Sequence, residues 1–172
     1  MNIPFLGVEP SWFSHNHRLK VFREFIGDTQ GRVLDIGSSN RLATALGITR
    51  HTWETDFNRE IHADSKDYDI ITCFDVIEHL MNPLGMLDFI HENLRQGGVC
   101  YLSTPRPSIP RNPSHFFETT RPRWELAFRY AGLEVVRYKL FRMHDWQAAL
   151  TGFRPMWHIL TYREHLWELR KP

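Results

Sequence analysis

Short apolar runs of strand length alternate with helical stretches along this chain, and this alternation limits the folds that the chain can adopt. YDIITCFDV, residues 68–76, is the clearest buried strand, and RVLDI, residues 32–36, is another. Between and after such runs, apolar residues recur at helical spacing, as in the stretch that follows Asn82-Pro83 and ends near Gly97-Gly98. Strands that alternate with helices predict an α/β domain with a mostly parallel sheet.

The other elements are predicted from the same two patterns. A first helix ends near Gly27, and a short helix covers residues 40–47. The remaining strand candidates are HTWETD, EIHAD, VCYLSTP, LEVVRYKLF and the terminal HLWELRK, and a helix that begins near Pro122 separates the third and fourth of these. In open α/β sheets ligands bind at the carboxyl ends of the strands, so functional residues are expected there.

The length and composition indicate one folded domain. At 172 residues, with 42% hydrophobic and 24% charged residues, we expect a single domain over 1–172 with an N-terminal helical region over 1–27. No apolar run reaches the roughly 18 residues of a membrane span, and the first residues do not resemble a signal peptide. Cys73 and Cys100 lie in predicted buried strands, which favours reduced thiols and a cytoplasmic protein with no membrane partner.

Charge is distributed unevenly along the chain. Residues 1–100 hold 9 Lys/Arg and 14 Asp/Glu, whereas residues 101–172 hold 12 and 6. A basic second half can meet an anionic small molecule or can be a solvated face. The chain has no long basic segment with interleaved aromatic residues, which argues against a nucleic-acid partner. The sequence gives no indication of the oligomeric state.

The turn after residues 32–36 is the first candidate ligand site. Asp35 precedes the turn, and Gly37 stands where the backbone can come close to a ligand. Asp56 follows 21 residues after Asp35, a distance that suits an acid accepting hydrogen bonds from ribose hydroxyls. Ser39 and Arg41 replace the later glycines of a diphosphate-binding loop, which argues against a nicotinamide cofactor. A cofactor without phosphates, S-adenosylmethionine, fits this turn better. The alternatives are that Asp35 caps the next helix and that Asp56 only forms a turn.

Five motifs, in order, resemble those of the class I S-adenosylmethionine-dependent methyltransferases, in their small-molecule branch. They cover residues from about 18 to 172 and are VLDIGSSN, YDIITCFDVIEHL followed by NP, LRQGGVCYLSTP, HFFETTRPRWELAFRYAGLEVV and HLWELRKP. The resemblance implies a Rossmann-like sheet of seven strands, the last antiparallel, with helices on both faces. It also implies S-adenosyl-L-methionine as the cofactor and a small-molecule methyl acceptor.

The resemblance also implies roles for individual residues. Asp35, Gly37 and Ser38 would lie at the methionine end of the cofactor. Asp56 would hold the ribose hydroxyls. The remaining cofactor contacts would come from Phe57 against adenine, Asp64 near the adenine amine, and Phe74 with Asp75 at the end of the fourth strand.

Two histidine motifs are candidates for chemistry. Asp75, Glu78 and His79 are spaced to share one face of a helical turn, and a similar pattern in quinone-biosynthesis O-methyltransferases can carry a divalent metal. Such a Glu/His pair also occurs in relatives without a metal, and with three evident ligands we expect none here. His115 is the candidate general base, with Glu118 beside it, because an imidazole titrates near physiological pH. The alternative for His115 is a structural hydrogen bond within its loop.

Two functions therefore stay open. The first is methyl transfer to a small molecule, with a preference for an anionic acceptor. The second is a binding or regulatory module with a methyltransferase fold and no catalysis, which the loss of loop glycines favours. The residues after the fifth predicted strand, Thr104-Pro105-Arg106-Pro107, differ from the Asn-Pro-Pro-aromatic motif of enzymes that methylate nucleic-acid bases.

Overall fold

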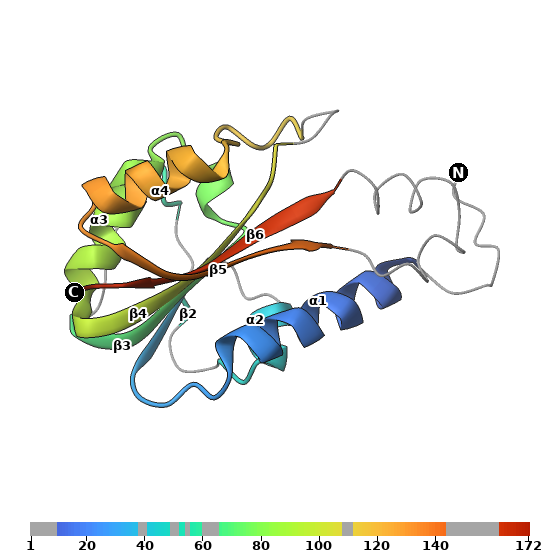
Figure 1. The fold of residues 1–172 in the computed structure, drawn as a ribbon, viewed down its shortest axis with the longest axis horizontal. Coiled ribbons are helices and arrows are strands. Elements are labelled where there is room, and N and C mark those ends of the chain that lie inside the picture. The colour runs from blue at the N-terminus through green and yellow to red at the C-terminus, as the bar shows by residue number, and fades with distance from the viewer. Residues whose placement is uncertain are drawn as a thin grey trace.

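The chain folds around a single twisted sheet with helices on both of its faces (Figure 1). This computed structural model describes residues 10–37, 41–48, 52–53, 56–59, 66–107, 112–143 and 162–172. The described residues form six strands in the order β2-β1-β3-β4-β6-β5. The strands are β1 (Val33–Ile36), β2 (Thr52–Trp53), β3 (Tyr68–Phe74), β4 (Leu94–Pro105), β5 (Glu134–Arg142) and β6 (Arg163–Arg170).

The helices follow the predicted positions closely. Those in the described part of the chain are α1 (Pro10–Ile26), α2 (Arg41–Ala45), α3 (Pro83–Asn93) and α4 (Arg121–Tyr130), with a 3-10 turn, η1 (Ile77–His79), after β3. Asn82 caps α3, because its side chain accepts a hydrogen bond from the Gly85 amide at 3.2 Å, and Pro83 occupies the first helical turn.

The strand directions confirm most of the predicted topology. β2, β1, β3 and β4 pair in parallel, and the last strand, β6, lies antiparallel between β4 and β5. The predicted count of seven strands is not confirmed, since the described residues form six. The weak strand candidate EIHAD, residues 60–64, lies outside the described residues.

One predicted boundary is wrong. The helix that was expected to end at Gly97-Gly98 ends at Asn93, and β4 begins at Leu94 and runs through both glycines. Leu94 already pairs with Tyr68, and a register shift follows between Tyr68 and Ile70 on the partner strand. Gly97 adopts a φ of 73°, which allows the strand to bend at this point.

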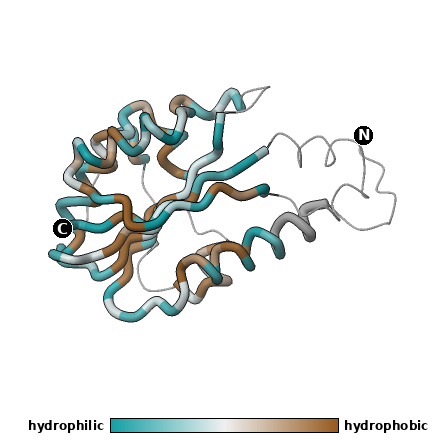
Figure 2. Tube along the Cα trace, in the orientation of Figure 1, coloured by the Kyte–Doolittle hydropathy of each residue, from teal (hydrophilic) through white to brown (hydrophobic). Residues whose placement is uncertain are grey.

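Two hydrophobic clusters, one on each face, bury the sheet. α3 and α4 cover one face and α1 and α2 the other (Figure 1). The first cluster contains Trp124, Phe128 and Trp167, and the second contains Phe22 and Phe74. The hydropathy tube shows the apolar strands between the two helical layers (Figure 2). Strands buried on both faces explain why the central runs are apolar throughout rather than alternating.

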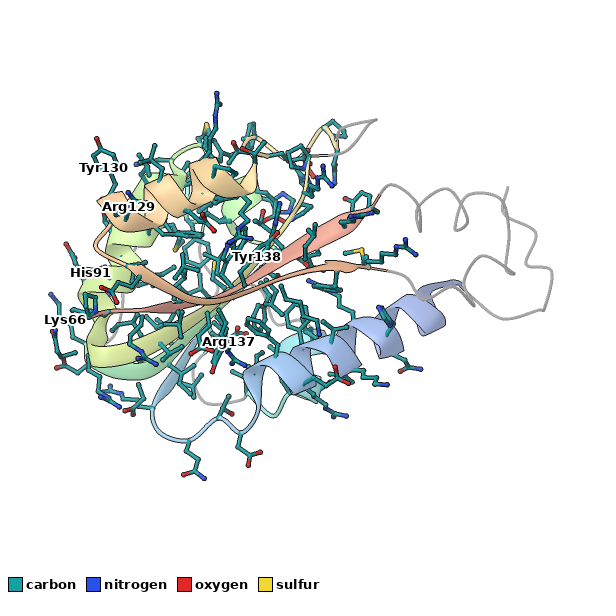
Figure 3. All side chains as sticks on the ribbon, viewed as in Figure 1. Lys66, His91, Arg129, Tyr130, Arg137 and Tyr138 are labelled. Carbon is teal, nitrogen blue, oxygen red and sulfur yellow. The ribbon has the colours of Figure 1, made fainter. Side chains whose placement is uncertain are left out.

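Strand β5 shows how successive side chains reach opposite faces. Tyr138 points toward α4 and Arg137 toward α1 (Figure 3). The Arg121 guanidinium of α4 lies 4.0 Å from the centre of the Tyr138 ring. Arg137 donates from Nη2 to the Phe25 carbonyl of α1 at 2.6 Å. This strand therefore ties both helical layers to the sheet.

Two smaller expectations concern the core and the membrane. Cys73 and Cys100 are fully buried free thiols in β3 and β4, as predicted. Among the described residues, no helix combines the length and the apolar character that crossing a membrane requires.

Replacement of Leu87 tests the packing of α3. Leu87 is fully buried in the first cluster, whereas Leu84 on the same helix is half-exposed. We expect Leu87→Ala to lower the free energy of unfolding by about 2–5 kcal/mol, because it removes buried methyl groups and leaves a cavity. Leu84→Ala should change the free energy of unfolding by less than about 0.5 kcal/mol. Urea denaturation of both variants measures the difference, and equal losses would contradict this packing.

Candidate functional site

The carboxyl ends of β1 and β3 form the point where the chain order of the sheet reverses. From β1 the chain passes to β2 on one side and then returns to β3 on the other side. Ligands in open α/β sheets bind outside such a reversal. Gly37 follows β1 and Asp75 follows β3, so the two predicted residues meet at this edge.

Asp35 is a buried carboxyl beneath this edge. It is 1% exposed, and its Oδ1 accepts a hydrogen bond from the Thr72 hydroxyl of β3 at 2.5 Å. Its Oδ2 has no hydrogen-bond partner among the described residues. Burial raises the pKa of Asp35 to about 6, although the Thr72 hydrogen bond opposes this shift. A buried acceptor oxygen without a partner is what a ligand that donates hydrogen bonds can satisfy.

Gly37 allows the backbone to come close to the neighbouring strand end. Its φ is 125°, and a Cβ at this position would lie 2.8 Å from Val76 Cγ2. A larger residue would therefore need both a strained backbone and a displacement of Val76. The glycine keeps the space above β1 open.

A cavity of about 280 Å³ opens above Gly37. It is open to solvent and has two walls, one from the turn after β2 and the other from the segment after β3. Its lining residues are Gly37, Asp56, Phe57, Asn58, Asp75, Val76, His79 and Leu80. Four of the residues predicted to contact a cofactor thus line one cavity: Gly37, Asp56, Phe57 and Asp75.

Asp56 is the exposed acid of this cavity. Its side chain is 58% exposed, and Arg59 Nε lies 3.2 Å from Oδ2. Its Oδ1 accepts a hydrogen bond from the Asn58 amide at 3.1 Å, which makes an Asx-type turn. The same carboxylate forms a turn and lines the cavity, so the geometry is compatible with both predicted roles of Asp56, a contact to ribose hydroxyls and a turn former.

Asp75 belongs to a cluster of charges that joins three elements. Arg18 of α1 donates from Nη2 to Asp75 and also to Glu164 of β6, the latter at 2.6 Å. Ser103 of β4 donates to Asp75 Oδ1 at 3.2 Å, and Asp75 has a left-handed backbone with a φ of 54°. Burial opposes the charge on Arg18, but the Glu164 and Asp75 carboxylates outweigh it and raise the pKa of Arg18. Burial and the Asp75 carboxylate raise the pKa of Glu164.

His115 and Glu118 form a buried pair on the loop before α4. His115 Nδ1 lies 2.5 Å from Glu118 Oε1, and both side chains are almost fully buried. The Asn112 side-chain nitrogen lies 3.1 Å from His115 Nε2. When Nδ1 carries the proton and donates to Glu118, Nε2 carries the lone pair that accepts from Asn112. The pair has the geometry of an oriented imidazole base, and it also makes the local hydrogen bond of the structural alternative.

His79 separates this pair from the cavity. The His79 and His115 rings meet edge to face with their centres 4.8 Å apart, and His79 lines the cavity. His79 Nδ1 lies 3.0 Å from the Ser114 carbonyl oxygen, an arrangement that places a proton on Nδ1 and a lone pair on Nε2.

Three side chains here are arranged so that they could hold a metal ion. Ligand atoms of Glu78, His79 and His115 all lie within 4.8 Å of one another. Glu78 is 1% exposed, and its Oε2 has no hydrogen-bond partner among the described residues. Burial and the nearby Asp75 carboxylate raise the pKa of Glu78. The sequence pattern suggested Asp75 as the third member, but the structure brings His115 to this position, while Asp75 pairs with Arg18.

The other predicted residues lie elsewhere or are not described. The Phe74 side chain is buried in the second cluster, with its ring centre 4.9 Å from that of Phe22. Ser38 and Asp64 lie outside the described residues.

Sequence reasoning missed Arg18, Glu164 and Asn58. Arg18 looks like a polar position of an amphipathic helix, and Glu164 like a solvent-facing residue of a last strand. Their pairing depends on α1 and β6 meeting across 146 positions of sequence. The only sequence signal for Asn58 is its position two residues after Asp56, a spacing that is typical of an Asx turn.

Comparisons with known proteins identify the family. A family profile described as a methyltransferase domain matches residues 14–153. The chain therefore belongs to the methyltransferase-domain family, which confirms the resemblance to class I S-adenosylmethionine-dependent methyltransferases. S-adenosylmethionine is the cofactor that this membership indicates.

One curated relative is the ubiquinone biosynthesis O-methyltransferase of Psychrobacter cryohalolentis. It is 33% identical over 127 residues, which cover 69% of this chain and 44% of the relative. The chain thus spans less than half the length of this relative.

Solved structures share the fold. A putative methyltransferase from Bacillus halodurans C-125 has a TM-score of 0.64 at 15% identity, covering 90% of this chain and 98% of that one. The 1,6-didemethyltoxoflavin-N1-methyltransferase of Burkholderia thailandensis, solved with 1,6-didemethyltoxoflavin and S-adenosylhomocysteine, has a TM-score of 0.60 at 17% identity. It covers 92% of this chain and 78% of that one.

The buried Asp35 carboxyl gives a pH-dependent prediction. Its folded pKa of about 6 lies above its ordinary value of 3.8, so the folded protein binds this proton more tightly than the unfolded chain. The resulting stability is present at about pH 4 and below, and it is lost as the pH rises through about 6. Asp35→Asn removes this titration and keeps an oxygen for Thr72.

We therefore expect the melting temperature of the wild type, relative to Asp35→Asn, to fall between about pH 4 and pH 7. Differential scanning calorimetry across this range measures it. Asp88→Asn, at an exposed position of α3, is the control. If the difference in melting temperature between the wild type and Asp35→Asn stays the same from about pH 4 to pH 7, Asp35 is not a buried ionisable group.

Proposed function

We propose that this chain transfers a methyl group from S-adenosylmethionine to a hydroxyl group of a small molecule. The observation that carries the proposal is the cavity at the ends of β1 and β3, where Gly37, Asp56, Phe57 and Asp75 come together in a chain of the methyltransferase family. The name of the ubiquinone biosynthesis relative supports oxygen as the accepting atom.

The residues present fit the cofactor. The open space above Gly37 suits the methionine end, to which we also assign Asp35 and Ser38. Asp35 is buried and is not among the lining residues of the cavity, and its Oδ2 lacks a partner among the described residues. The exposed Asp56 carboxylate suits the ribose hydroxyls, and Phe57 suits a flat adenine ring. We assign Asp64 to the adenine amine and the Phe74 backbone and Asp75 to the edge of the cofactor.

The chemistry requires little from the protein beyond alignment and a base. When bound, S-adenosylmethionine supplies a methyl group that its sulfonium has already activated. The protein must align the acceptor oxygen with that methyl carbon and exclude water. His115 Nε2 is the group that would take the hydroxyl proton of the acceptor as its oxygen receives the methyl group. Glu118 holds the imidazole by its Nδ1 proton. For this step the acceptor hydroxyl would have to pass the His79 ring and replace the Asn112 amide on Nε2.

The charge of the acceptor is a finer part of the proposal. Arg106 directly follows β4 at the edge of the sheet that holds the cavity, and its amide donates to the Arg163 carbonyl at 2.9 Å. The positive charges of Arg106 and Arg163 at this edge support an anionic acceptor, such as one with a carboxylate.

Cofactor binding gives the first test. Calorimetric titration should show that S-adenosylmethionine and S-adenosylhomocysteine bind and that NADH does not. Asp56→Ala should weaken both by about tenfold or more, because hydrogen bonds to a charged group contribute about 1.5–3 kcal/mol. Asp88→Ala is the control for loss of an exposed acid. No binding to the wild type would refute the proposal. Binding without transfer to any acceptor would favour the non-catalytic module.

Proton transfer and metal use are tested by the rate of methyl transfer to a panel of phenols and hydroxy acids. His115→Gln should lower the rate by about 10²–10⁴, because it removes the group that would accept the hydroxyl proton. EDTA should leave the wild-type rate unchanged. Loss of activity in EDTA that Mg²⁺ or Zn²⁺ restores would instead assign Glu78, His79 and His115 as metal ligands, whose ion would polarise the acceptor oxygen.

A further inference from the structure

We propose that Asn58 is a positioning residue that holds the two walls of the cofactor cavity at their binding distance. The inference rests on the proposed function, because it assigns the cavity to S-adenosylmethionine. It adds a residue that touches neither reacting atom and that has no counterpart in the motifs of the sequence.

The topology leaves the two walls without a direct connection in the sheet. One wall follows β2 and the other follows β3, and β1 lies between these strands. No ladder hydrogen bond can therefore join β2 to β3. Above β1 stands Gly37, which has no side chain to fill the gap. Among the described residues, side chains reach across from the turn after β2: Phe57 packs against the first cluster, and Asn58 makes hydrogen bonds.

Asn58 makes this connection with both ends of its amide. Its Oδ1 accepts a hydrogen bond from the Met81 amide at 2.7 Å, and its Nδ2 donates to the His79 carbonyl at 3.3 Å. A flipped amide would place donor against donor and acceptor against acceptor, so the two partners fix its orientation. Asn58 thus binds backbone groups on both sides of Leu80, which lines the cavity.

The backbone of Asn58 fixes the other wall. Its amide donates to Asp56 Oδ1 at 3.1 Å, and the Arg59 amide donates to the Asp56 carbonyl at 2.8 Å. The same residue therefore orients the Asp56 carboxylate and anchors its turn to the segment after β3. The Asp56–Arg59 ion pair lies at the surface, where such a pair contributes little to order.

Holding the walls in place before the ligand arrives reduces the ordering cost of binding. Without the Asn58 side chain, the turn after β2 keeps its own hydrogen bonds but loses the two that join it to the backbone on both sides of Leu80. The consequence should appear in affinity for the adenosine part of the ligand and not in the stability of the core.

Calorimetric titration with S-adenosylhomocysteine tests the inference. We expect Asn58→Ala to raise the Kd about tenfold, and 5′-methylthioadenosine should lose the same factor because both share the adenosine part. Asn58→Asp keeps the acceptor for Met81 but cannot donate to the His79 carbonyl, so it should also bind more weakly than the wild type. Asn82→Ala is the matched control, because Asn82 caps α3 and does not line the cavity.

The control separates positioning from stability. Asn82→Ala should lower the melting temperature and leave the Kd unchanged, whereas Asn58→Ala should change the Kd with a smaller effect on melting. An Asn58→Ala Kd within twofold of the wild type would overturn the inference, as would equal weakening by Asn82→Ala. Failure of the wild type to bind is a different result, since it removes the proposed function itself.

Amide hydrogen exchange of the free protein gives a readout that needs no ligand. The Met81 amide should exchange faster in Asn58→Ala than in the wild type, while the amides of β3 should be unchanged. Unchanged protection of Met81 would show that Asn58 does not hold this segment, whatever the titration shows.

Discussion

Burial of the central strands on both faces is the constraint on which this structure depends. β1, β3 and β4 lie between two layers of helices, so most of their side chains are apolar, and buried polar ones such as Asp35 and Thr72 pair with each other. Polar chemistry is displaced to the strand ends, where the backbone stops pairing. Parallel strands place these ends at one edge, and the reversal between β2 and β3 opens a cavity there. The positions of Gly37 and Asp75 follow from this arrangement.

Burial of charged side chains at that edge costs solvation free energy, and ion pairs that share one guanidinium offset this cost. Arg18 pairs with two carboxylates, Asp75 after β3 and Glu164 of β6. Removal of Arg18 would leave the buried Glu164 carboxyl without its cation, which costs far more than an exposed pair contributes. The cluster thereby specifies how α1 docks against the sheet, and it holds Asp75 at the cavity in an unfavourable left-handed backbone conformation.

Much of the candidate site could be predicted because its residues follow strands directly. Asp35 and Gly37 stand at the end of an apolar run, and Asp56 stands at a fixed distance beyond it. The helix boundary near Gly97 was wrong because a bulged, twisted strand uses glycine at the same place where a helix would end. The third member of the His-rich cluster was also missed. His115 reaches Glu78 and His79 only because the loop before α4 folds back over η1, where the Phe117 amide donates to the Glu78 carbonyl.

The sequence by itself determined the class of fold, the family and the cofactor, because these depend on local patterns: apolar runs, a glycine turn and an acid at a set spacing. The pairings between distant elements were decided only by the tertiary structure. Arg18 with Glu164, Asn58 with Met81, and His115 with His79 are contacts between segments that local pattern cannot bring together. Their formation depends on which strands become neighbours and which loops cross between them. The sequence therefore predicts the methyl donor, S-adenosylmethionine, whereas the shape of the cavity that would hold it depends on the folded chain.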